Sequence, residues 1–85
     1  MVLNMQNKTT IKNEKLKLVM RNPYVQTAVR LEINRFRLRN GLSPLAPGEL
    51  GRTVSKALSG EKAPEVEQLM DGINRYHERK KGIQK

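Results

Sequence analysis

Cysteine and tryptophan are absent from this 85-residue sequence, and histidine occurs once. The lack of cysteine excludes a disulfide framework and a thiolate metal site, and it suits a reducing compartment. Two tyrosines and one phenylalanine are the only aromatic residues, too few for a protein that binds single strands by stacking their bases. The eight carboxylates are scattered along the chain without an acid, base or ligand constellation. We therefore expect a protein that is not an enzyme, has no small-molecule substrate, and needs neither a metal nor another cofactor.

Long apolar runs are absent as well. The longest are three residues, at positions 1–3 and 18–20, far shorter than a membrane span or the apolar region of a signal peptide requires. We expect a cytoplasmic protein that does not enter a membrane. Its length predicts one domain, which would bury about 60–65% of the surface of the unfolded chain.

Acidic residues are few in proportion to basic ones. The sequence has 17 lysines and arginines against eight aspartates and glutamates, a formal net charge of +9. Nine of the basic residues but only two of the acidic ones fall within residues 1–41. A charge of this size and sign predicts a polyanionic partner, and nucleic acid is the leading candidate.

Apolar periodicity and helix-boundary residues predict three or four helices and no strand. Residues 1–10 lack a clear period and are interpreted as a flexible basic arm, so the helical domain would span residues 11–82 and residues 83–85 would fray. A first helix runs from Ile11 to about Arg21, and Asn22-Pro23 ends it and begins the next one. A long helix follows from Tyr24 to about Asn40, ended by Gly41. The last helix begins at Pro64 and carries the single histidine, His77, at the edge of its apolar face.

The long helix has two apolar stripes. One stripe is expected to face the core, and the other consists of Tyr24, Leu31 and Leu38 at sevenfold spacing. Heptad spacing of this kind is typical of a helix that meets another helix. The second stripe is therefore either a homodimer interface or a further buried face of the monomer. Four arginines lie along the same helix, so it is also a candidate for binding nucleic acid.

Between these helices, residues 42–64 hold the signals of one short helix. Pro47 suits a first helical turn and Gly60 suits the residue just past a helix end, so a helix is predicted over residues 47–59. Its apolar stripe (Leu50, Val54, Ala57 and Leu58) is expected to face the core. The opposite side carries Arg52, Ser55, Lys56 and Ser59, a row of donors without an acid that suits phosphates and base edges.

Two short segments resemble the helix-turn-helix domains of phage repressors and Cro-like regulators. They are RLRNGLS at residues 37–43 and TVSKALSGEKAP at residues 53–64. The resemblance implies that Thr53, Ser55 and Lys56 lie at the DNA and that Val54 and Leu58 lie in the core. Only nine residues separate Gly-Leu-Ser from Thr-Val-Ser, about four fewer than the family pattern has. Either Gly51 is the turn glycine of a shortened motif, or residues 47–59 form a single helix.

These observations predict a small all-α protein that binds duplex DNA as a dimer, in the manner of a phage- or plasmid-type transcriptional regulator or accessory factor, in the nucleoid. The residues predicted to contact nucleic acid are Arg30, Asn34, Arg35, Arg37, Arg39, Arg52, Thr53, Ser55, Lys56 and Lys62. Two alternatives stay open. One is RNA binding through the arginine-rich helix, and the other is an adaptor or inhibitor that binds a protein through Tyr24, Leu31 and Leu38.

Overall fold

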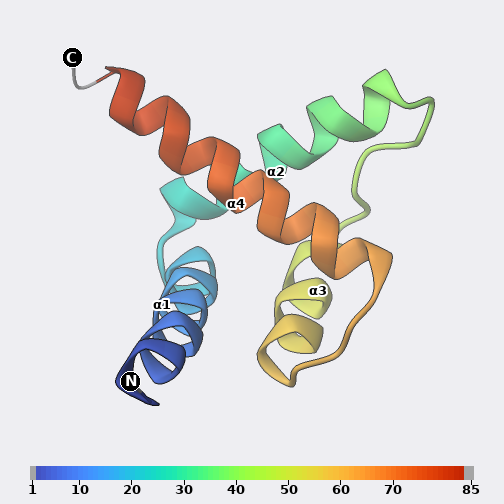
Figure 1. Ribbon diagram of the computed structural model, residues 1–85. Coiled ribbons are helices and arrows are strands. Elements are labelled where there is room, and N and C mark those ends of the chain that lie inside the picture. The colour runs from blue at the N-terminus through green and yellow to red at the C-terminus, as the bar shows by residue number, and fades with distance from the viewer. Residues whose placement is uncertain (1, 84–85) are drawn as a thin grey trace.

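Four α-helices form the chain in the computed structural model, which describes residues 2–83, with side-chain surroundings for residues 11–81 (Figure 1). They are α1 (Val2–Arg21), α2 (Pro23–Arg39), α3 (Glu49–Leu58) and α4 (Pro64–Ile83). Because the described residues contain no strand, the predicted all-α fold class is confirmed. Of the tail predicted to fray, Ile83 is the last residue of α4, and residues 84–85 lie outside the described part.

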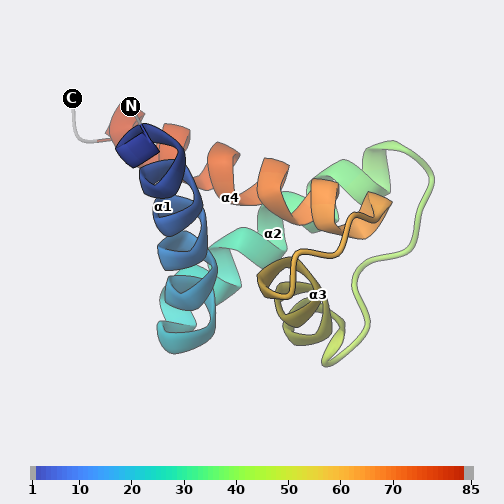
Figure 2. The same ribbon diagram turned by 60° about the horizontal axis from the view of Figure 1, so that its bottom comes forward.

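Each helix packs against two others, so that the contacts form a closed ring from α1 to α2, α4, α3 and back to α1. Figure 1 shows α1 and α3 side by side in the lower part of the view, with α2 and α4 crossing each other above them, and Figure 2 shows the same ring from another side. One core fills the centre of the ring and receives side chains from all four helices. Its buried apolar residues are Leu16, Val19, Val25, Val29, Ile33, Leu50, Val54, Ala57, Val66, Leu69 and Ile73.

Helices α2 and α4 approach each other closely, because a buried glycine lies where they cross. A Cβ added to Gly72 would lie 2.6 Å from Ile33 Cγ1 and 3.7 Å from the Val29 carbonyl oxygen, so the backbone of α4 lies directly against α2. One turn further along, the Arg75 guanidinium carbon lies 5.2 Å from the centroid of the Phe36 ring. Both contacts join the middle of α4 to α2, where the two helices cross.

The ends of α2, and the end of α3, follow the predicted boundary residues. The Asn22 side-chain oxygen accepts hydrogen bonds from Tyr24 N at 2.9 Å and Val25 N at 3.3 Å, and Pro23 occupies the first turn. Gly41 and Gly60 lie just past α2 and α3 with φ of 73° and 84°. After each glycine, the next residue's N–H bonds back to a carbonyl of the last turn, which is the Schellman pattern.

Two predicted starts are corrected by the structure. Helix α1 begins at Val2 rather than Ile11, so residues 2–10, interpreted as an arm without structure, are part of a helix. Helix α3 begins at Glu49 rather than Pro47. Pro47 and Gly48 instead form the centre of a turn in which Glu49 N donates to the Ala46 oxygen, with Gly48 at φ 82° and ψ −11°, values that belong to the third residue of a type II turn.

Within residues 42–60 the structure has a single helix, and Gly51 lies inside it. Of the two alternatives for this stretch, the single helix therefore holds. Its predicted apolar stripe is buried at Leu50, Val54 and Ala57. Leu58 is 38% exposed, which corrects its predicted place in the core, because the buried face of α3 is formed by Leu50, Thr53, Val54 and Ala57 and Leu58 lies at its edge.

Candidate nucleic-acid interface

The side chains predicted to contact nucleic acid divide between two parts of the ring. Arg30, Asn34, Arg35, Arg37 and Arg39 belong to α2, and the others belong to α3 and the loop after it. Each of these two helices packs against α4 and α1, so the two sets are carried by different helices of the ring.

On α3, the structure corrects the prediction for Thr53. Its side chain is buried, with 6% of the residue exposed, and its hydroxyl donates to the Glu49 carbonyl oxygen at 2.9 Å. It belongs to the packed side of the helix, so it is not free to meet a ligand. Arg52, Ser55 and Lys56 are exposed on α3, and Lys62 is exposed in the following loop.

On α2, two of the predicted residues are used to hold the loop between α2 and α3. The Asn34 side-chain oxygen accepts a hydrogen bond from Leu45 N at 2.8 Å. Arg37 donates to the Ser43 carbonyl oxygen at 2.6 Å and to the Gln68 side-chain oxygen at 3.3 Å. Both side chains are partly buried. Part of the hydrogen-bonding capacity of each side chain is therefore used within the fold, which gives both a structural role.

Arg35 and Arg39 are exposed, and residues from α4 join them. A groove of about 530 Å³ between α2 and α4 is lined by Arg35, Arg79 and Lys80 together with Glu32 and apolar side chains. A smaller groove of about 350 Å³ adjoins it, shares Arg35 and Arg79, and adds Arg39 and Leu38. We refer to the two together as the α2/α4 groove. Four cationic side chains thus line one continuous surface.

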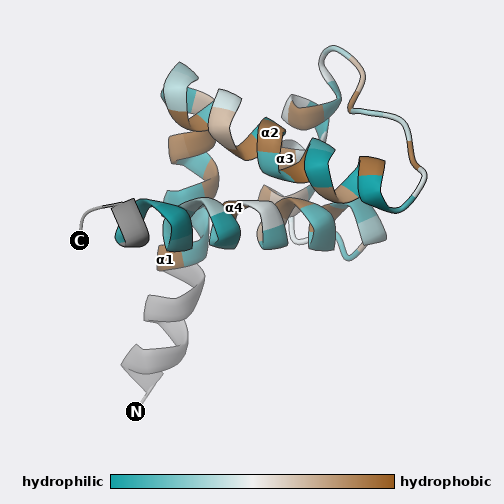
Figure 3. Cartoon of the chain, turned by 90° about the horizontal axis from the view of Figure 1, so that it is seen from above, coloured by the Kyte–Doolittle hydropathy of each residue, from teal (hydrophilic) through white to brown (hydrophobic). Residues whose placement is uncertain are grey.

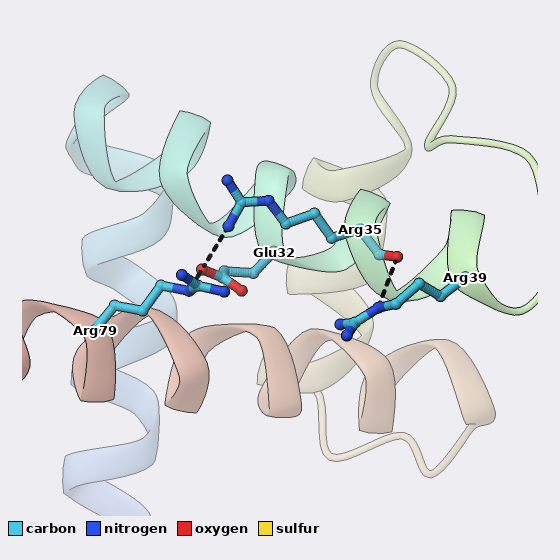
Figure 4. A network of polar contacts seen from close by, with 4 residues as sticks. All are labelled: Glu32, Arg35, Arg39 and Arg79. Carbon is cyan, nitrogen blue, oxygen red and sulfur yellow. Dashed lines mark hydrogen bonds and ion pairs between the residues drawn. The ribbon is translucent and has the colours of Figure 1, made fainter.

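Glu32 is the one carboxylate that lines this groove. Its side chain is only 6% exposed, and it forms ion pairs with Arg79 and, at 3.7 Å, with Arg35 (Figure 4). The side chains of Arg35 and Arg79 are 50% and 59% exposed, so both guanidinium groups also reach solvent. Arg39 follows on the same side and donates from Nε to the Arg35 carbonyl oxygen at 3.4 Å. A buried acid therefore fixes two of the cations while the surface stays positive.

The turns of α4 that precede its grey end are hydrophilic (Figure 3). Here the pKa of His77 is lowered from its ordinary value, first by partial burial and then by the positive charges of Lys15, Lys80 and Lys81. A neutral imidazole packed edge-on against Tyr76, with ring centroids 5.0 Å apart, matches the expected place of His77 at the core edge.

The other features found among the described side chains differ from this surface. A third, larger groove of about 760 Å³ near the start of α4 mixes Lys12 and Lys62 with three carboxylates, so it offers no single sign of charge. In the described part of the chain, no group of three or more histidine, aspartate or glutamate side chains lies together as a metal site would need. No helix among the described residues has the length and apolarity needed to cross a membrane.

Sequence reasoning missed the α4 half of this surface. The sequence alone assigns no binding role to Arg79, Lys80, Tyr76 or Glu32. The signals that were available are the cluster of cations near the end of α4 and the single acid among the arginines of α2. Neither signal says that the two helices meet.

The chain matches no protein-family model, no curated protein and no solved structure in the comparisons made.

Proposed function

We propose that this protein binds duplex DNA through the α2/α4 groove, and that it does so without catalysing a reaction. The observation that carries the proposal is the convergence of Arg35, Arg39, Arg79 and Lys80 from two helices. The only acid lining the groove is buried and already paired with two of them. Clustered arginines and lysines of this kind bind phosphates and release the counterions of DNA.

The proposed contacts are to the backbone of DNA. Arginine forms bidentate hydrogen bonds with phosphate oxygens, and Glu32 holds two of the guanidinium groups in place before DNA arrives. Any base readout would come from elsewhere on the chain, and Arg52, Ser55 and Lys56 of α3 are the exposed candidates. A role as a transcriptional regulator or accessory factor in the nucleoid remains part of this proposal.

The predicted dimer needs the same surface. Leu31 and Leu38 line the groove beside Arg35 and Arg39, so a two-fold dimer through the leucines would bring the arginines of both copies together. Like charges at close range oppose such an interface. We therefore propose that each copy binds DNA by its own groove, and the dimer through Tyr24, Leu31 and Leu38 stays a prediction.

A salt titration of binding tests the proposal. Log Kd for a random duplex should depend steeply on log salt, because each phosphate contact contributes about 0.9 to the slope. The double variant Arg39→Gln/Lys80→Gln removes two groove cations without touching the Glu32 pairs, so the slope should fall by about two. Duplex RNA of the same length, assayed in parallel, distinguishes the DNA proposal from the RNA alternative.

The matched control is Arg52→Gln/Lys56→Gln, which removes two exposed cations from α3. Because its net charge equals that of the groove variant, any difference between the two reports position rather than total charge. If both double variants weaken binding and flatten the slope to the same extent, the groove is not the binding surface and the proposal fails.

A further inference from the structure

The α2/α4 groove has an apolar floor that phosphate binding does not use. Ala28, Leu31 and Tyr76 line its larger part, and Leu38 lines the adjoining part. Leu31 and Leu38 are 47% and 59% exposed. Isolated exposed leucines are common on proteins, but here two of them lie in one groove and share it with a tyrosine.

The spacing of the floor matches a helix. Leu31 and Leu38 are seven residues apart on α2, which places them two turns, or about 10 Å, from each other along the helix axis. A second helix lying beside α2 would present apolar side chains at the same interval, as in heptad packing. Amphipathic helices bind apolar grooves in this way.

The charged residues at the rim of the groove favour a helix with acidic side chains. Arg35 and Arg39 border the floor from α2, and Arg79 and Lys80 border it from α4. Glu32 is buried and paired with two of these cations, so the exposed rim is positive on both sides. A helix with glutamates or aspartates flanking its apolar stripe would satisfy both sides at once, whereas a second copy would bring its own α2 arginines against these.

We propose that the α2/α4 groove binds an acidic amphipathic helix of a partner protein, with Leu31, Leu38 and Tyr76 against its apolar stripe and the four cations against its carboxylates. The helix and DNA would use the same cations and would exclude each other. That last consequence rests on the proposed DNA binding, but the binding of the helix does not.

The test uses the full chain and a synthetic peptide of about 18 residues, roughly 27 Å long as a helix. Its leucines stand at i, i+4, i+7 and i+11, and glutamates occupy most other positions. Two control peptides keep the length: one has the same composition in scrambled order, and the other has lysine in place of each glutamate. Fluorescence anisotropy measures Kd for each peptide. The ordered acidic peptide should bind, and both controls should bind at least about tenfold more weakly.

Variants of the protein assign the site. Leu31→Ser/Leu38→Ser should weaken the ordered peptide by about tenfold or more, since it removes the apolar floor. Ile11→Ser/Leu42→Ser also removes two exposed apolar side chains, 54% and 42% exposed, and should leave binding unchanged. Arg39→Gln/Lys80→Gln should weaken binding and reduce its dependence on salt, and circular dichroism should show the helix content of wild type in every variant.

Three results would overturn the proposal. Equal binding of the ordered and scrambled acidic peptides would mean attraction by charge alone. A wild-type dimer in sedimentation that Leu31→Ser/Leu38→Ser converts to a monomer would make a second copy the occupant. Binding of anionic phospholipid vesicles that depends on the two leucines, without peptide binding, would make a membrane surface the occupant.

The same variants separate this proposal from the proposed function. Leu31→Ser/Leu38→Ser keeps all four cations, so it should bind duplex DNA as wild type does. Peptide binding without DNA binding would remove only the DNA proposal, and DNA binding without peptide binding would remove only this one.

Discussion

Gly72 sets the distance between α2 and α4. Glycine in a helix interior costs about 1 kcal/mol relative to alanine, and here that cost accompanies a close backbone approach. The atom nearest to an added Cβ is Cγ1 of Ile33, a buried residue that is 3% exposed. Since β-branched side chains are held in one χ1 rotamer in a helix, Ile33 cannot move away without disturbing the core.

We predict that Gly72→Ala lowers the free energy of unfolding by about 1–3 kcal/mol through overpacking, despite the better helix propensity of alanine. Urea unfolding followed by circular dichroism measures the change. Gly51→Ala is the matched control, because a Cβ there would meet only Met20 Cε, at an ordinary 3.7 Å. That control should be neutral or stabilised by up to about 1 kcal/mol. A stabilised Gly72→Ala variant would show that α2 and α4 do not lie this close.

His77 should make stability depend on pH. Its pKa is lowered in the folded chain by burial and by nearby lysine charges, whereas the unfolded chain takes up the proton near the ordinary pKa of about 6.5. Below that pH the unfolded state binds more protons, so stability is complete above about 6.5 and declines as the pH falls toward the lowered folded value.

The measurement compares urea unfolding of wild type and His77→Gln at about pH 7.5 and about pH 5.5. The loss of stability on acidification should be smaller in His77→Gln. Carboxylates titrate alike in both proteins, so the difference between them isolates the histidine. An identical loss in both would mean that the pKa of His77 is not lowered.

At the scale of elements, the loop between α2 and α3 is held by side chains of α2 rather than by its own backbone. Asn34 accepts from Leu45 N, and Arg37 donates to the Ser43 oxygen. These bonds tie the start of the loop to α2, so Asn34 and Arg37 have a structural role in addition to their place on an arginine-rich helix.

We therefore predict that Asn34→Ala lowers the free energy of unfolding by about 1–2 kcal/mol, because Leu45 N loses its partner. Asn74→Ala, a change of the same chemistry at an exposed position of α4, should have an effect below about 0.5 kcal/mol. Thermal unfolding of both variants measures the difference. If Asn34→Ala instead unfolds like wild type and loses DNA affinity, the original prediction of a nucleic-acid contact at Asn34 is right.

Several helix boundaries were predictable because their causes are local. Asn22-Pro23, Gly41 and Gly60 act on neighbouring backbone groups, and each appears where the sequence predicts it. The start of α3 was wrongly predicted at Pro47, because proline suits a first helical turn and the second position of a type II turn equally well. The glycine that follows, Gly48, favours the type II turn.

The candidate surface was only half predictable, because its other half depends on packing. Arg35 and Arg39 share a face of one helix, which periodicity predicts. Arg79 and Lys80 join them only because α4 crosses α2 at Gly72, a contact between residues far apart in sequence. The prediction that Thr53 contacts nucleic acid was wrong for a related reason. A short helix that packs on two neighbouring helices buries more of its circumference than its apolar stripe alone predicts.

At the scale of the whole molecule, the charge of +9 acts on stability as well as on binding. Repulsion among 17 cations in a domain of 85 residues opposes the folded state. Glu32 is the acid that forms ion pairs with basic residues in the described side chains, so salt has much repulsion to screen and few attractions to weaken.

We predict that salt shifts the thermal midpoint in opposite directions with and without DNA. For the protein alone, raising NaCl from about 0.05 M to about 0.3 M should raise the midpoint, because it screens repulsion. Free duplex at about 100 times its Kd adds about 2.7 kcal/mol of stability by linkage, which raises the midpoint of a domain of this size by roughly 10–20 °C. The same increase in salt should then lower the midpoint of the complex, because the affinity itself falls with salt.

Two double variants test where the DNA binds. Arg39→Gln/Lys80→Gln should show a smaller effect of salt on the midpoint than wild type, both with and without DNA. Arg52→Gln/Lys56→Gln should show the same reduced effect as the groove variant only in the series without DNA. A midpoint that rises equally with salt in both series would mean that DNA is not bound through released counterions, and the proposed function would fail with it.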